Sequence, residues 1–119
     1  MTPQVSAAYG EGRYEVHGTA LRCGTDLTAA FVGGTLPHVG AVSLGVYEAA
    51  RDSATVSTIT AFGHRDDILA AEAAKQLAVA VKGTASVSVG IHLDAASAED
   101  IELLCKNFEL CLKTLMQLL

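Results

Sequence analysis

The spacing of apolar residues along this 119-residue chain changes from strand period to helical period at Gly63. Before that glycine, apolar and polar residues alternate in stretches covering 13–32, 38–47 and 55–62. After it, helical spacing over 66–82 is followed by alternation over 85–93 and by helical spacing from 97 onward. Because residues 13–32 form two strands, this order predicts an α+β fold with the succession β-β-β-β-α-β-α.

Turn residues divide the strand region. Gly24-Thr25-Asp26 separates the two halves of residues 13–32, which reads as a hairpin, and Gly33-Gly34 with Pro37 interrupts the pattern again. The last strand follows a helix, so it can pair in parallel with a neighbour through a right-handed crossover. We expect a five-stranded, mainly antiparallel sheet with two helices on one face. Residues 1–119 form a single domain in this interpretation, with 1–12 loosely ordered.

Both predicted helices carry start signals. Asp66 and Asp67 fall in the first turn of the first helix, where acidic groups suit the positive end of the helix dipole. Ser97 opens the second helix, with Asp100 three residues later as a weak form of capping box. These signals place the helix starts within a few residues.

The predicted sheet has an unusual second face. Val87, Val89 and Ile91 belong to the face under the helices, whereas the opposite face carries small residues rather than charges. Its expected rows are Ser86, Ser88, Gly90 and His92, and Ala41, Ser43 and Gly45. Small side chains permit close approach of a second sheet in a homodimer, or leave room for a flat ligand. The two interpretations are compatible if the ligand lies at the edge of the dimer interface.

Charge and composition exclude several functions. The net charge is −5, the eight Lys and Arg are scattered, and only six residues are aromatic, so neither nucleic acid nor a polybasic membrane contact is expected. No apolar run approaches the ~20 residues that cross a bilayer, and the first residues do not resemble a signal peptide. Three cysteines, an odd number, suggest thiols in a reducing cytoplasm.

Three of the four histidines stand near glycine at the ends of strand-like runs. Gly63-His64-Arg65 lies where a strand turns into a helix, a place suited to a phosphate or carboxylate. His38 follows Gly33-Gly34, and His92 follows Gly90 and precedes Asp94, which could orient its ring. Each could equally belong to an ordinary turn. If His38, His64 and His92 converge, they could bind a divalent metal ion. His17, inside a strand, is expected to be structural.

The three runs Gly33–Ser43, Gly63–Asp67 and Gly90–Asp94, in this order and spacing, resemble the LpdD-like prenylated flavin chaperone domain. The resemblance covers residues 13–115. It implies a non-catalytic accessory protein that binds prenylated FMN, or FMN, and hands it to a UbiD-type decarboxylase of (hydroxy)aromatic acids. His38, His64 and His92 then contact the ligand directly or through a metal ion.

A flavin would place its phosphate at the helix start and its rings over the small-residue face. The expected cofactor contacts are Gly33, Gly34, His38, Ser43, Gly63, His64, Arg65, Ser88, Gly90 and His92. Two alternatives remain open at this point: a small metalloenzyme that uses the three histidines, and a purely structural subunit of a decarboxylase. No G-x-S-x-G elbow and no nucleotide-binding glycine fingerprint supports another enzyme class.

Overall fold

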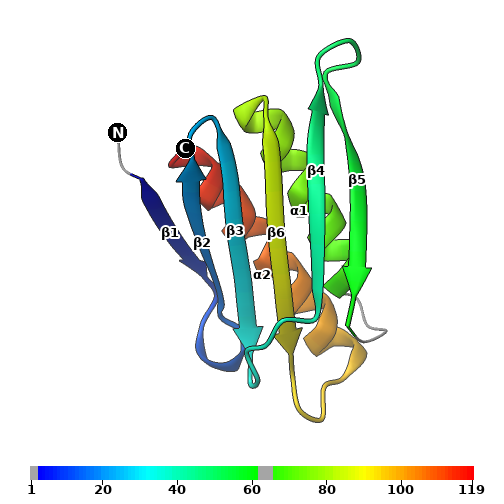
Figure 1. Ribbon diagram of the computed structural model, residues 1–119. Helices are drawn as coiled ribbons and strands as arrows, with labels where there is room; N and C mark the ends of the chain where they lie inside the picture. The colour runs from blue at the N-terminus through cyan, green and yellow to red at the C-terminus, as the bar shows by residue number, and fades with distance from the viewer. Residues whose placement is uncertain (1–2, 62–65) are drawn as a thin grey trace.

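The computed structural model describes residues 3–61 and 66–119, which form one sheet with two helices packed on one of its faces (Figure 1). The elements in chain order are β1 (Gln4–Tyr9), the 3-10 helix η1 (Gly12–Tyr14), β2 (Val16–Cys23), β3 (Asp26–Gly34), β4 (Ala41–Glu48), β5 (Ser53–Thr60), α1 (Asp66–Val81), β6 (Thr84–His92) and α2 (Ala98–Gln117). The predicted α+β class with two helices is confirmed.

The sheet has six strands in the order β1-β2-β3-β6-β4-β5. The strands β3 and β6 are parallel, and all other neighbours are antiparallel. The prediction of five strands was therefore wrong, and the sheet is mixed. The unpredicted strand, Gln4–Tyr9, pairs along its length with Val16–Leu21. Its small residues give little alternation of their own, so its strand conformation depends on β2.

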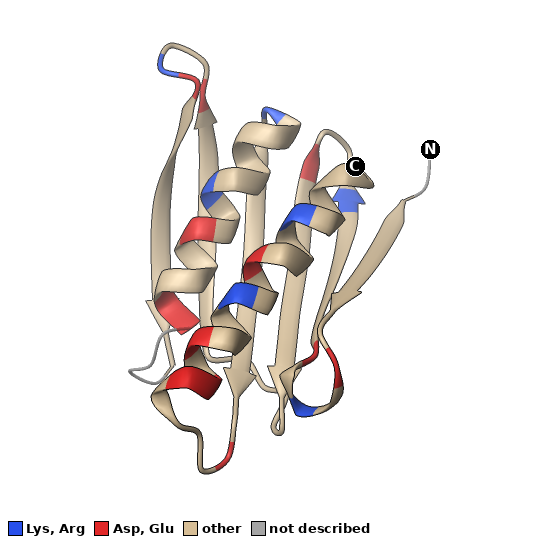
Figure 2. Ribbon diagram, turned by 180° about the vertical axis from the view of Figure 1, so that it is seen from behind, with Lys and Arg blue, Asp and Glu red and all other residues tan. Residues whose placement is uncertain are grey.

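The two helices share the covered face of the sheet (Figure 2). Helix α2 packs over β1 and β2, and α1 packs over β4, β5 and β6. Phe31 of β3 meets Phe108 of α2 edge to face, with ring centroids 5.1 Å apart, at the centre of the core. In Figure 2 the coloured Lys, Arg, Asp and Glu residues lie mainly on the outer surfaces of the helices and on the loops.

The two faces of β4 are reversed relative to the prediction: the row expected on the open face lies under the helices. Ala41, Ser43 and Gly45 are buried under α1, whereas Val42, Leu44 and Val46 point away from the helices and are exposed. Any side chain at Gly45 would collide with the carbonyl of Ala74 in α1. Helix α1 therefore lies so close to β4 that only small residues fit between them, and the row placed on the open face was assigned wrongly.

Within the described ranges, neither helix is long and apolar enough to cross a membrane. Cys23 is exposed and Cys111 is buried, and neither belongs to a disulfide. Burial raises the pKa of the Cys111 thiol to about 11. This thiol therefore stays protonated at neutral pH and behaves as a core residue.

Candidate functional site at the carboxyl end of β3 and β6

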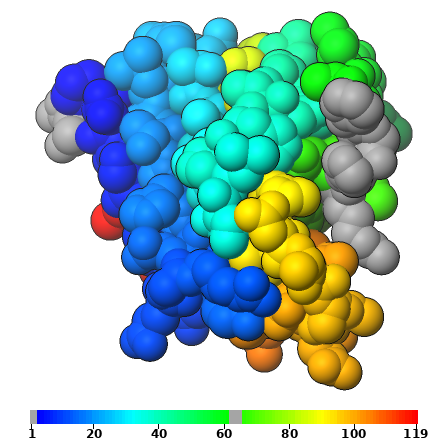
Figure 3. Space-filling view, turned by 90° about the horizontal axis from the view of Figure 1, so that it is seen from below, coloured from blue at the N-terminus to red at the C-terminus, as the bar shows by residue number. Residues whose placement is uncertain are grey.

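The strands β3 and β6 end side by side, and the chain must cross β6 to pass from β3 to β4. The segment 35–40 makes this crossing on the face away from the helices. A side chain at Gly90 would overlap the carbonyl of His38, and one at Gly34, whose φ is +82°, would overlap the carbonyl of His92. Both glycines are needed for the close approach of the two backbones. In Figure 3 the cyan segment after β3 lies against the yellow segment after β6.

Backbone and side-chain hydrogen bonds fix the crossing segment at both ends. Thr35 donates its N–H to the carbonyl of His92 at 2.7 Å, and its hydroxyl accepts from the N–H of Asp94 at 3.0 Å. At the other end, Gly40 donates to the carbonyl of Val89 at 2.9 Å. The segment is therefore tied to β6 before and after it crosses that strand.

A buried carboxylate holds the middle of the segment. Asp66, the first residue of α1, has a side chain that is only 3% exposed. One carboxylate oxygen lies 3.1 Å from Nε2 of His38, and the other accepts the N–H of Ile91 at 3.2 Å. Gly40 leaves the space that this carboxylate occupies, because a side chain there would overlap it. Asp66 thus accepts the N–H at the end of the β4–β6 ladder and fixes the His38 ring. These two contacts offset the free-energy cost of burying the Asp66 carboxylate.

Both ring nitrogens of His38 have protein partners in this arrangement. Nδ1 lies 2.9 Å from the carbonyl of Leu36, which can only accept, and Nε2 faces the Asp66 carboxylate. A metal ion or a phosphate could use a ring nitrogen of His38 only by displacing one of these groups. His38 therefore shapes the crossing segment as long as these two contacts hold.

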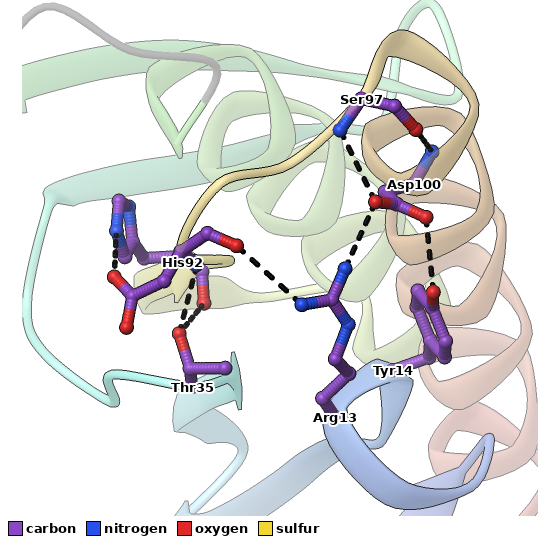
Figure 4. Close-up of polar contacts among 7 residues, drawn as sticks. Arg13, Tyr14, Thr35, His92, Ser97 and Asp100 are labelled. Atoms are coloured by element: carbon purple, nitrogen blue, oxygen red, sulfur yellow. Dashed lines mark hydrogen bonds and ion pairs between the residues drawn. The ribbon is translucent and has the colours of Figure 1, made fainter.

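His92 lies at the same end of the sheet and is more open. Its ring is 44% exposed, and Nε2 pairs with Asp94 at 3.0 Å. Figure 4 shows how this corner continues: Arg13 donates to the carbonyl of Asp94 and forms an ion pair with Asp100 at 2.9 Å. The hydroxyl of Tyr14 donates to the other oxygen of Asp100. Polar contacts thus connect η1, the end of β6 and the start of α2.

Hydrogen bonds stabilise the charged form of Asp100. The backbone N–H of Ser97 contributes most, followed by the hydroxyl of Tyr14, and together they lower the pKa of the carboxyl. The Ser97 hydroxyl accepts from the N–H of Asp100 in return, which completes the predicted capping box. The corner beside His92 is therefore held by several side-chain hydrogen bonds and one ion pair.

The structure brings together part of the predicted site. Gly33, Gly34, His38, Gly90 and His92 lie at this end of the sheet, and Ser88 lies further along β6 on the open face. Ser43 lies on the other face, fully buried and 2.7 Å from the Thr58 hydroxyl. The predicted contacts Gly63, His64 and Arg65 fall outside the described residues.

Sequence reasoning missed two residues of this site. Asp66 was interpreted only as a favourable charge in a first turn, and Thr35 was not singled out. Their partners are separated from them by 25 to 59 residues, so no local pattern could have identified them. In residues 3–61 and 66–119, no group of three His, Cys, Asp or Glu side chains is arranged to hold a metal ion. A metal site that includes His64 remains a prediction.

The open face of the sheet leads away from this end. Thr28, Ala30, Ser86 and Ser88 form a lane of small side chains along β3 and β6. Exposed apolar residues lie on the strands that border the lane, at Leu21, Val42, Leu44 and Val46, and Ile59 lies beyond β4 on β5. In the described strands no Lys or Arg points to this face, and carboxylates do so only at strand ends, at Asp26 and Glu48. The lane and its borders can bind a flat, largely apolar group.

Comparison with solved structures supports the fold. A chain from the structure titled "Crystal Structure of a Novel Chaperone Complex for Yeast 20S Proteasome Assembly" is similar, with a TM-score of 0.61 and 12% sequence identity. The match covers 98% of this chain and 95% of that one, and at this identity it shows a shared fold only. No curated protein matches the sequence.

Comparison with protein families is more specific. The family described as the prenylated flavin chaperone LpdD-like domain matches residues 10–119, which include the crossing segment, both helices and five of the six strands. This range contains every residue of the site described above. The chain therefore belongs to the LpdD-like prenylated flavin chaperone family.

Proposed function

We propose that this protein is a non-catalytic carrier that binds prenylated FMN and delivers it to a UbiD-type decarboxylase of (hydroxy)aromatic acids. The observation that carries the proposal is the family match over residues 10–119, joined to a sheet face whose strands carry carboxylates only at their ends and which leads to the crossing segment. A cytoplasmic location and assembly as a homodimer belong to the same proposal. FMN itself is the simpler ligand of the same shape.

In this proposal the ring system lies on the lane of β3 and β6 near Ser88, next to the crossing segment, whose His38 carbonyl covers Gly90. Small side chains allow a planar group to approach the sheet closely, while their hydroxyls supply a few hydrogen bonds. Leu36 and Val39 of the crossing segment are exposed apolar residues beside this end of the lane. They provide an apolar wall against which the prenyl-modified ring can pack.

The phosphate belongs at the start of α1, where Gly63, His64 and Arg65 are its proposed contacts. Helix starts favour anions, but in α1 Asp67 already accepts the N–H of Ile68 and Asp66 lies beside it, so the proposed positive charge for the phosphate comes from Arg65. His92 stands at the same end of the sheet and can reach a polar edge of the ligand. Because few charged residues contact the ligand in this proposal, the affinity for the cofactor is low, which suits a protein that must release it.

A titration with matched histidine variants tests this placement. His92 and His17 are both exposed on the open face, and each pairs with a carboxylate two residues away at 3.0 and 2.8 Å. We expect His92→Ala to weaken binding of prenylated FMN by about tenfold, as loss of one hydrogen bond of about 1.4 kcal/mol would. His17→Ala should bind like the parent, because His17 lies on β2, on the other side of β3 from the crossing segment and β6.

The readout is the change in flavin absorbance as prenylated FMN is added to each purified variant. No saturable binding by the parent would refute the carrier function. Equal loss in both variants would refute the placement at the carboxyl end of β6. Turnover of a substrate by the isolated chain with stoichiometric metal would favour the metalloenzyme, and co-purification with a decarboxylase without flavin binding would favour a structural subunit.

A further inference from the structure

We infer that the outer edge of β5 is the interface between two copies of this chain, which pair their β5 strands antiparallel and so join their two sheets into one. The strand β5 is an outer strand of the sheet (Figure 1), and among the described residues no strand pairs with its free side. Because this contact runs along the edge of the sheet, it leaves the lane on β3 and β6 uncovered. The inference therefore does not rest on flavin binding.

Backbone hydrogen bonds show which groups of β5 point away from the sheet. Ala61 donates its N–H to the carbonyl of Gly40 at 2.8 Å, which continues the β4–β5 ladder. In agreement, Tyr47 of β4 donates in the other direction, to the carbonyl of Gly83 just before β6. Successive residues of a strand direct their N–H and C=O groups to opposite sides. The residues of β5 that direct these groups outward are therefore Ala54, Val56, Thr58 and Thr60.

The composition of β5 suits a strand that is paired on both sides. Its eight residues, Ser-Ala-Thr-Val-Ser-Thr-Ile-Thr, include five β-branched residues and neither a charge nor a proline. The other outer strand, β1, has six residues, of which Val5 is β-branched, and it follows Pro3. Proteins protect free sheet edges with short strands, prolines and charges, and β5 has none of these. The edge of β5 is therefore the one open to addition of a strand.

The outward groups determine how two copies meet. Ser57 is at the centre of the outward residues, so a two-fold axis at Ser57, perpendicular to the sheet, uses all of them. The axis pairs Ala54 with Thr60 of the other copy, and Val56 with Thr58. Each such pair exchanges two hydrogen bonds, so the interface has about eight, close to the number in a typical protein interface. A second copy thus satisfies the whole edge.

Side chains on both faces of β5 also become covered by this pairing. In the single chain no residue of β5 is buried, although Ala54 and Val56 pack against the core on the helix side. On the open side Ile59 is 77% exposed, and the axis sets it opposite Thr55 of the other copy. Cross-strand pairs of β-branched residues stabilise a sheet. The pairing therefore extends the apolar packing that stops at β5 in the single chain.

The charges near β5 permit two copies to approach. Two chains with a net charge of −5 repel each other, but residues 53–61 carry no charge. Beyond the ladder, the axis brings the turn 49–52 of one copy toward the start of α1 in the other. Arg51 of this turn forms an ion pair with Glu48. Asp52 and Asp67 are like charges that approach each other there, but both are accessible to solvent, so salt screens their repulsion.

The edge is large enough for a specific interface of modest size. Eight residues that rise ~3.3 Å each give an edge about 26 Å long. The chain measures 20 Å in its smallest dimension, in which the helices are layered on the sheet. The contact therefore covers about 500 Å² of each copy, or about 1,000 Å² for the pair, which is the lower limit for a specific interface. The dimer should dissociate on dilution.

Two lysine variants distinguish the edge of the sheet from its open face. Ser57 on β5 and Leu44 on β4 are register partners, and both side chains are exposed on the open face. We expect the parent and Leu44→Lys to be dimers in light scattering at about 100 µM, above the micromolar affinity of weak interfaces. Ser57→Lys sets two ammonium groups opposite each other at the axis, so its dissociation constant should rise about tenfold or more.

Unchanged circular dichroism of Ser57→Lys would show that this variant is folded. A parent that is monomeric at the same concentration would overturn the inference. Equal weakening of the dimer by Leu44→Lys and Ser57→Lys would overturn it as well, because the contact would then include the open face.

Disulfide formation tests the register without a disruptive charge. The background is Cys23→Ser, which removes the exposed native thiol. Ser57→Cys then sets two thiols opposite each other in a non-hydrogen-bonded pair, where Cα atoms about 4.5 Å apart allow a disulfide to close. Thr55→Cys is the control on the same strand and face, because its two copies are about 13 Å apart along the strands. Mild oxidation should give a covalent dimer of Ser57→Cys and none of Thr55→Cys.

Absence of the Ser57→Cys product, or equal amounts of product from both variants, would contradict this pairing. Flavin binding is measured separately on the parent. A parent that dimerises but binds no flavin would refute the carrier function and leave the interface intact. A flavin-binding parent that stays monomeric would overturn the pairing and leave the edge of β5 to a strand of another protein.

Discussion

At the scale of single residues, the site depends on one buried carboxylate. Asp66 accepts from Ile91 and faces His38, and Gly40 leaves room for it. The sequence indicates an acidic residue at a helix start, which the structure confirms. It cannot indicate the two partners, because they lie on a loop and a strand that only the fold brings to the helix.

Replacing Asp66 with alanine should lower the free energy of unfolding by about 1–3 kcal/mol, because the part-buried N–H of Ile91 loses its acceptor. The adjacent Asp67→Ala provides the control. Among the described residues, Asp67 accepts from the N–H of Ile68 at the helix surface, so its loss should cost less than about 1 kcal/mol. Urea unfolding of both variants measures the difference, and equal losses would show that the Asp66 contacts contribute nothing beyond helix capping.

At the scale of elements, the helices were more predictable than the faces of the strands. The alternation and the turn signals located the strands from β2 to β6, and the capping box located the start of α2. The faces of β4 were reversed because α1 packs on that strand through alanines, against Gly45. In most strands the large apolar side chains are on the buried face. In β4 the small residues are on the buried face and the large apolar residues are exposed.

The cap of α2 predicts a dependence of stability on pH. Hydrogen bonds from Ser97 and Tyr14 lower the pKa of Asp100 in the folded protein below its ordinary value of 3.8. A lowered folded pKa adds stability that is complete above pH 3.8 and is lost as the pH falls through the folded pKa. Asp100→Asn should therefore be less stable than the parent at pH 7.

The difference between Asp100→Asn and the parent should shrink as the pH is lowered from 4 toward 2. Thermal unfolding followed across this range measures it. A constant difference at every pH would show that the charge of Asp100 does not stabilise the helix start. Lys113→Gln, at an exposed position near the other end of α2, is the control. It should leave the change in stability between pH 4 and pH 2 the same as in the parent.

At the scale of the whole molecule, the two faces of the sheet differ in kind. The helices and their charges cover one face, and the strands of the other face carry carboxylates only at their ends, up to the crossing of β3, β6 and β4 (Figures 1 and 2). The sequence indicated three separate glycine–histidine motifs. That two of them meet depends on the insertion of β6 between β3 and β4, a non-sequential strand order that no local pattern determines.

The central claim is that the chain carries prenylated FMN to a decarboxylase, and a transfer measurement tests it most directly. The purified chain is loaded with prenylated FMN, desalted, and mixed with a UbiD-type decarboxylase that lacks its cofactor. The account predicts that about one flavin per chain survives desalting, and that decarboxylation appears as flavin absorbance leaves the carrier. A chain that retains no flavin, or a loaded chain that restores no more activity than the same amount of free cofactor, would contradict it.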